Sequence, residues 1–212
     1  MDGTESSFSF PAIFTASSSD ETYAFVEKLW AMRRVGEIID AIDLHGKNSE
    51  LTDELIALST KHGILTPYTS FLAEENTNLH DGVVNRRIAL QALDQLKQES
   101  GIAGFAQRAA KGKLQNASRA PAAGIARFRK ADDDSVVVVK TVQNVGAKTF
   151  FQRAGRWVDT SITEEQQKKV IELKRYSKEY FDLIAKHGKD AAKYLAIEGK
   201  VVVVFGGQAY SF

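Results

Sequence analysis

The sequence lacks cysteine, long apolar runs and an excess of charge of either sign. Without cysteine the chain has no disulfide, no thiolate metal site and no cysteine nucleophile. No apolar run approaches the roughly 18–20 residues that span a bilayer, so we expect no membrane insertion. Residues 1–9 show no basic region followed by an apolar core, so no signal peptide is expected. The 28 basic and 27 acidic residues leave a net charge of +1, which does not indicate a polyanion-binding protein as a whole.

Charge is nevertheless distributed unevenly along the chain. Residues 1–100 carry 8 basic and 16 acidic groups, a net charge of −8, whereas residues 101–130 carry 7 basic groups and no acidic ones. This basic segment is rich in Ala and Gly and has too few large apolar side chains for a core of its own. We therefore predict a first region over 1–100, a partly helical basic connector over 101–140 and a C-terminal domain over 141–212.

Apolar residues at steps of three and four predict a long first helix. Ser18 and Glu21 have the spacing of a capping box at its start, and Gly46 is expected to end it. Gly36 lies within the apolar stripe. Because glycine costs about 1 kcal/mol against alanine inside a helix, we expect another element to approach closely at that position.

Two further helices are predicted in the first hundred residues, over 48–62 and 81–99. Gly63 is expected to end the earlier of the two. Between them, the β-branched and aromatic residues 64–72 predict an extended segment that bends at Pro67.

The C-terminal third changes from long helices to short strands. A hairpin is predicted over 149–158, a strand near Ile171, and a valine-rich strand over 200–205 that returns toward the end of the chain. Between these strands, Ser177 is expected to cap a helix that breaks at Gly188. The sequence therefore predicts an α+β fold, with a helical N-terminal half followed by a small α+β C-terminal unit of hairpins around one helix.

Two groups of short motifs resemble a known family. The first pairs Leu-Trp-Ala at residues 29–31 with His-Gly-Ile-Leu-Thr-Pro-Tyr-Thr-Ser-Phe-Leu at 62–72; the second comprises Val-Gly-Ala-Lys-Thr-Phe at 145–150, Trp-Val-Asp at 157–159, Tyr-Phe-Asp-Leu at 180–183 and Tyr-Leu-Ala at 194–196. They resemble the inter-alpha-trypsin inhibitor heavy-chain family, and more closely the bacterial proteins that join a VIT domain to a von Willebrand factor A domain. The resemblance covers residues 25–72 and 145–212, and little of 80–140.

The resemblance implies a non-enzymatic interaction or scaffolding module, adhesion-like and located in the cell envelope or secreted. In that family these residues follow the A domain, so the chain would be the C-terminal portion of a longer protein. Its partners would be the upstream domains of that protein or a second copy of the chain. The family's metal-ion-dependent adhesion site has the pattern Asp-x-Ser-x-Ser, which does not occur here, so no metal ligand is carried over.

Four aromatic residues are candidate protein contacts: Phe8, Phe10, Trp30 and Trp157. Phe8 and Phe10 alternate as in a short strand that has no hairpin partner nearby, and we expect it to pair with an upstream region or a second copy. Trp30 lies on the wide apolar face of the first helix, where core packing is the favoured alternative. Trp157 lies on a hairpin arm, which leaves contact and core packing equally open.

The sequence indicates no catalytic residue, metal site or cofactor, and we predict that the chain is not an enzyme. Its four histidines, His45, His62, His80 and His187, have no metal-binding spacing, and we expect them at helix ends or on the surface. The three aspartates at 132–134 lack the glycine and the distal glutamate of a calcium loop. They therefore predict a solvated turn.

The basic segment 101–130 supports an alternative function, binding of nucleic acid or another polyanion. Its seven basic residues could contact phosphates, and Phe105 and Phe128 could stack on bases. The acidic first hundred residues would repel a polyanion, however. We therefore favour a helix or linker that lies along the acidic part of the chain, and expect nucleic acid to be the less favoured partner.

Overall fold

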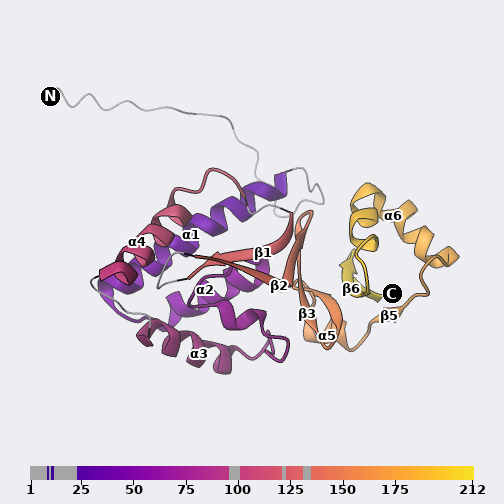
Figure 1. Cartoon of the computed structure of the whole chain (residues 1–212). Helices are drawn as coiled ribbons and strands as arrows, with labels where there is room; N and C mark the ends of the chain where they lie inside the picture. The colour runs from indigo at the N-terminus through magenta and orange to yellow at the C-terminus, as the bar shows by residue number, and fades with distance from the viewer. Residues whose placement is uncertain (1–8, 10, 12–22, 96–100, 121–122, 131–134) are drawn as a thin grey trace.

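The computed structural model describes residues 9, 11, 23–95, 101–120, 123–130 and 135–212. Helices occupy mainly the N-terminal half and strands the C-terminal half, which confirms the predicted α+β fold (Figure 1). Phe8 and Phe10, the Ser18 and Glu21 pair, and the aspartates at 132–134 lie outside the described residues.

The three helices predicted in the first hundred residues are present. They are α1 (Ala24–His45), α2 (Ser49–His62) and α3 (Gly82–Gln95). Gly46 ends α1 with a positive φ of 85° and donates its N–H to Ile42 O at 2.9 Å. Gly63 ends α2 in the left-handed region, at φ 63°. Both glycines therefore stop their helices as their positions in the sequence predicted.

The prediction of an extended segment over 64–72 is wrong. Residues 66–69 form a turn, in which Thr69 N donates to Thr66 O and Thr66 N donates to Thr69 Oγ1, both at 3.1 Å. The 3-10 helix η2 (Ser70–Ala73) follows directly. The threonine hydroxyl satisfies backbone groups locally, and this competes with the pairing that a strand would need.

Residues 101–140 fold onto both halves of the molecule. Helix α4 (Gly101–Gln115) lies along α1, and strand β1 (Gly124–Arg129) pairs antiparallel with β2 (Val136–Val145) (Figure 1). The sequence predicted helical content here but not β1. The close approach expected at Gly36 is confirmed, because a Cβ added there would lie 2.9 Å from both Gln115 N and Gln115 Cγ.

The described strands form one seven-stranded sheet in the order β1-β2-β3-β4-β6-β7-β5. Its remaining members are β3 (Lys148–Arg153), β4 (Arg156–Asp159), β5 (Ile171–Glu172), β6 (Lys200–Phe205) and β7 (Gln208–Ser211). Neighbours are antiparallel except for the pairs β4–β6 and β5–β7, which are parallel. The connections between β4 and β6 contain α5 (Glu164–Gln167) and α6 (Lys178–Leu195).

The elements predicted in the C-terminal third are all observed. Strands β3 and β4 form the hairpin predicted over 149–158, and β6 and β7 form the final one. Ser177 Oγ caps α6 by accepting from Tyr180 N at 3.3 Å, and Gly188, with φ 71° and ψ −159°, breaks that helix.

The sheet is the shared core of the two halves. Phe150 and Phe151 are both fully buried and point to opposite faces of β3. Phe150 packs with Tyr194 of α6, and Phe151 packs with Leu72 and Ala89 from the helical half. Alternation along one strand therefore joins the helical region to the C-terminal unit.

Candidate protein-interaction site

The first turns of α1 carry an apolar face that the described residues leave open to solvent. The exposed fractions are 67% for Tyr23, 54% for Phe25, 51% for Val26 and 54% for Trp30. The expectation that Trp30 packs in the core is therefore wrong. The buried stripe of α1 begins at the next residue, Ala31, which faces a different direction on the helix.

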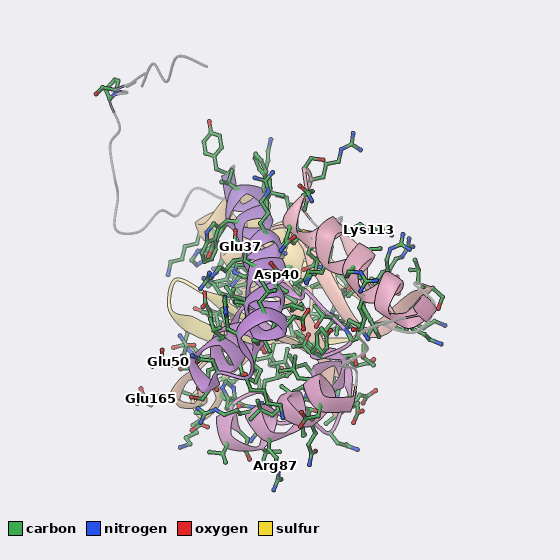
Figure 2. The ribbon with its side chains drawn as sticks, turned by 90° about the vertical axis from the view of Figure 1, so that its left-hand side faces the viewer. Glu37, Asp40, Glu50, Arg87, Lys113 and Glu165 are labelled. Carbon is green, nitrogen blue, oxygen red and sulfur yellow. The ribbon has the colours of Figure 1, made fainter. Side chains whose placement is uncertain are left out.

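This face is open because α4 covers only the later part of α1. Figure 2 shows α4 beside α1, with Asp40 on α1 and Lys113 on α4. Lys111 Nζ lies 2.5 Å from Asp40 Oδ1 and 3.2 Å from Asp43 Oδ2. Just past the end of α4, Arg33 Nε donates to Ala117 O at 2.9 Å. The favoured interpretation of the basic segment, a helix along the acidic part of the chain, is thus confirmed.

Beneath the exposed face, a buried lysine attaches α1 to the sheet. Lys28 Nζ donates to Asn144 Oδ1 at 2.9 Å, and Thr149 Oγ1 donates to the same oxygen at 2.8 Å. Burial lowers the pKa of Lys28 to about 8, although the nearby Glu27 carboxylate acts in the opposite direction. The start of α1 is therefore held by a polar contact and not by apolar packing alone.

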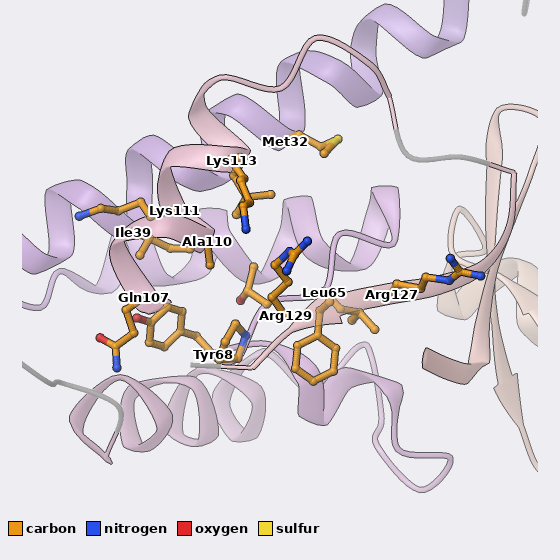
Figure 3. Close-up of a pocket in the computed structure, with 14 residues that line it drawn as sticks. Met32, Ile39, Leu65, Tyr68, Gln107, Ala110, Lys111, Lys113, Arg127 and Arg129 are labelled. Atoms are coloured by element: carbon orange, nitrogen blue, oxygen red, sulfur yellow. The ribbon is translucent and has the colours of Figure 1, made fainter. Parts of the chain in front are cut away.

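The apolar stripe of α1 leads from the exposed face into a hollow of about 180 Å³ (Figure 3). Phe25, Leu29 and Met32 follow one another at steps of four and three, and Met32 projects into this hollow. Its other apolar walls are Ile39, Leu65, Pro67, Tyr68, Leu114 and Phe128, from α1, α4, β1 and the turn before η2. Burial raises the pKa of Tyr68 to about 12, which keeps its hydroxyl neutral.

Basic side chains surround this hollow, and its described lining contains no acidic residue. In Figure 3 Lys113 and Arg129 point toward the space, whereas Lys111 and Arg127 point away from it. The hollow therefore combines apolar walls with a positive rim, and it can accept an apolar side chain of a partner protein.

The other predicted contact, Trp157, is half-buried and packs against the core beneath α6. The histidines occupy helix ends or a loop, as expected, but His62 is not on the surface. Burial lowers the pKa of His62 to about 4, and His187 stacks on Phe205 with ring centres 5.3 Å apart. Neither the sequence pattern nor the local spacing signalled that His62 would be buried.

Two features were searched over the residues that the structure describes. No three His, Asp or Glu side chains gather there as a set of metal ligands. No described helix is both long enough and apolar enough to cross a membrane. Comparison of the chain with protein families, with curated proteins and with solved structures gives no match.

Proposed function

We propose that this chain is a non-enzymatic protein-interaction module, the C-terminal portion of a VIT/von Willebrand A-type protein, and that the first turns of α1 are its docking surface. The observation that carries the proposal is the set of four neighbouring apolar side chains, each at least half exposed, on a helix whose later part is embedded. Contiguous exposed apolar side chains are typical of interaction sites.

The partner that we favour is the domain preceding these residues in the parent protein. The chain enters α1 beside Tyr23, so a preceding domain would be tethered next to the exposed face. Tethering raises the effective concentration of a partner and allows a modest apolar contact to form. The family resemblance supports the same choice, because it places an A domain upstream of this region.

The alternative, polyanion binding by residues 101–130, has less support. Lys111 of this segment is engaged by Asp40 and Asp43, so its charge is not available to phosphates. The two functions differ in their salt dependence, because phosphate contacts weaken steeply as salt is raised and an apolar interface does not.

Sedimentation velocity tests the proposal, with the chain alone at several concentrations and mixed with the separately expressed upstream region. We expect association that changes little between about 50 and about 300 mM salt. The double variant Phe25→Ser/Trp30→Ser should weaken it at least about tenfold, because it removes two large apolar side chains from the interface. Val83→Ser, at a position of α3 that is 79% exposed, is the matched control and should have no effect.

Two outcomes would contradict this proposal. A strict monomer that also ignores the upstream region would refute the docking surface. Binding that collapses between low and moderate salt would favour the polyanion alternative.

A further inference from the structure

A second hollow, of about 220 Å³, lies where the helical half meets the C-terminal unit. Its walls come from the end of α2, the loop before α3, the end of β3 and the segment from β4 to α5. Among the residues that line it are Thr60, His80, Arg153, Asp159 and Gln167. The hollow is separate from the exposed face of α1 and independent of the proposed function.

Arg153 is the cation of this hollow, and no described carboxylate pairs with it. Its Nη1 donates to Gln152 O at 2.7 Å and its Nη2 to Leu72 O at 2.6 Å, while the buried Nε has no hydrogen-bond partner. Burial lowers the pKa of Arg153, and the attraction of Glu75 only partly opposes this. A guanidinium has five N–H donors, so donors and positive charge remain unmatched here.

Further donors line the same space. The hydroxyl of Thr60 is buried and has no partner, and the side chains of His80 and Gln167 also contribute to the wall. A buried polar group without a partner costs free energy that a bound acceptor would recover.

Asp159, the acidic residue of the described lining, is already saturated. Its Oδ2 accepts from Lys148 Nζ at 2.6 Å and from Val204 N at 3.1 Å. Its Oδ1 accepts from the backbone N and the hydroxyl of Ser161, at 2.9 and 2.8 Å. Because Lys148 balances its charge, Asp159 neither serves the donors of Arg153 nor opposes an anion strongly.

We infer that this hollow binds a small oxyanion of phosphate size, held by the Arg153 guanidinium and by the hydroxyl and amide donors of Thr60 and Gln167. An oxyanion supplies the acceptors and the negative charge that the wall lacks. The volume is well above the roughly 10–15 Å³ that holds one water, and below the roughly 300 Å³ at which pockets for drug-sized ligands begin. Because both halves of the molecule contribute to the wall, the bound anion would fasten one to the other.

Thermal unfolding of the full chain in inorganic phosphate, against sodium chloride at matched ionic strength, tests the site. We expect phosphate to raise the melting temperature saturably, and Arg153→Met to abolish this rise. Arg156→Met, at an exposed position on the turn of the same hairpin, should respond as the wild type does. Phosphate also stabilises proteins in general, and such a general effect would be equal in all the variants.

A second variant keeps the test decisive if Arg153→Met fails to fold. Thr60→Val has nearly the same shape and removes only the unpartnered hydroxyl, so the free protein should be as stable as the wild type or more so. Its phosphate affinity should fall by about three- to tenfold. The site is refuted if phosphate stabilises the wild type no more than chloride does, or if Thr60→Val responds to phosphate as the wild type does.

Discussion

The two ends of α1 are held in different ways. The later part is embedded: Val35 and Ile38 are fully buried in the helical core, and α4 covers another side of the helix. The first turns are attached from beneath through the contact of Lys28 with Asn144, and their upper side, with Phe25 and Trp30, is bare. One helix therefore has an end stabilised by apolar burial and an end attached by a buried cation.

This difference shows that the width of an apolar stripe indicates how much of a helix requires cover but not what supplies it. At the embedded end the cover is α4, from the basic segment. At the attached end the described residues supply none, and the inner side holds a lysine without a carboxylate partner. A buried unpaired cation and a bare aromatic pair are unfavourable in an isolated fold, and both are expected where a partner completes the surface.

The largest effect is expected from crowding the embedded end with Gly36→Leu. A Cβ there would lie 2.9 Å from the Gln115 backbone, so overpacking of about 1–3 kcal/mol or more should exceed the helix-propensity gain near 1 kcal/mol. We expect the free energy of unfolding in urea to fall by about 2 kcal/mol. Gly112→Leu in α4 is the control, because nothing lies within 4 Å of its added Cβ, and it should be neutral or stabilising. A stabilised Gly36→Leu protein would show that α4 is not packed there.

At the attached end, Lys28→Met should stabilise the protein at pH 7. The lysine is charged at this pH, and its pKa falls from 10.5 to about 8 on burial, a cost of about 3 kcal/mol, of which the lost hydrogen bond to Asn144 offsets about 1. Since the wild type gains stability as the pH rises from about 8 to 10.5, the advantage of Lys28→Met should shrink over that interval. Urea unfolding at pH 7 and at pH 10 measures both. A destabilised variant at pH 7 would mean that the polar contact outweighs the burial of the charge.

A smaller effect is expected from pH at His62, which lies below the same end, with its Nε2 3.9 Å from Glu27 Oε1. Its pKa is lowered from 6.5 to about 4 by burial, so the unfolded chain takes up the proton first. Stability should therefore be complete above about pH 6.5 and fall as the pH drops toward 4, by about 1–2 kcal/mol at pH 5. Comparison of the pH dependence of wild type and His62→Gln isolates this contribution. Equal pH dependence in the two proteins would place the imidazole in solvent.

The smallest perturbation is a single cut beside α4. We expect trypsin to cleave first within residues 101–134, and specifically after the exposed Arg119 between α4 and β1, because Lys111 is held within its helix by two aspartates. Arg119→Gln should move the first cut. Mass spectrometry of early fragments gives the answer, and first cuts inside 25–72 or 177–212 would contradict this ranking of the regions.

Features set by neighbouring residues were predictable from the sequence. The stops at Gly46 and Gly63, the cap at Ser177 and the break at Gly188 each depend on local backbone geometry. The close approach at Gly36 followed from the cost of glycine inside a helix.

Features set by distant residues were not predictable in this way. Strand β1 is defined by its pairing with β2, and the turn over 66–69 depends on side-chain hydrogen bonds that a propensity argument ignores. The exposure of Trp30 depends on where α4 ends. The hollow at Arg153 is assembled from both halves of the chain, and no local pattern brings Thr60 to the same wall.

The most direct test of the docking surface uses the environment of Trp30. The chain has two tryptophans, so Trp157→Phe leaves Trp30 as the single reporter on the bare end of α1. In the dilute chain we expect the long-wavelength emission of an exposed indole, and a shift to shorter wavelength when the separately expressed upstream region is added. The further substitution Phe25→Ser should weaken the response. A complex that forms without changing the emission of Trp30 would contradict the account, because the partner would then be bound elsewhere.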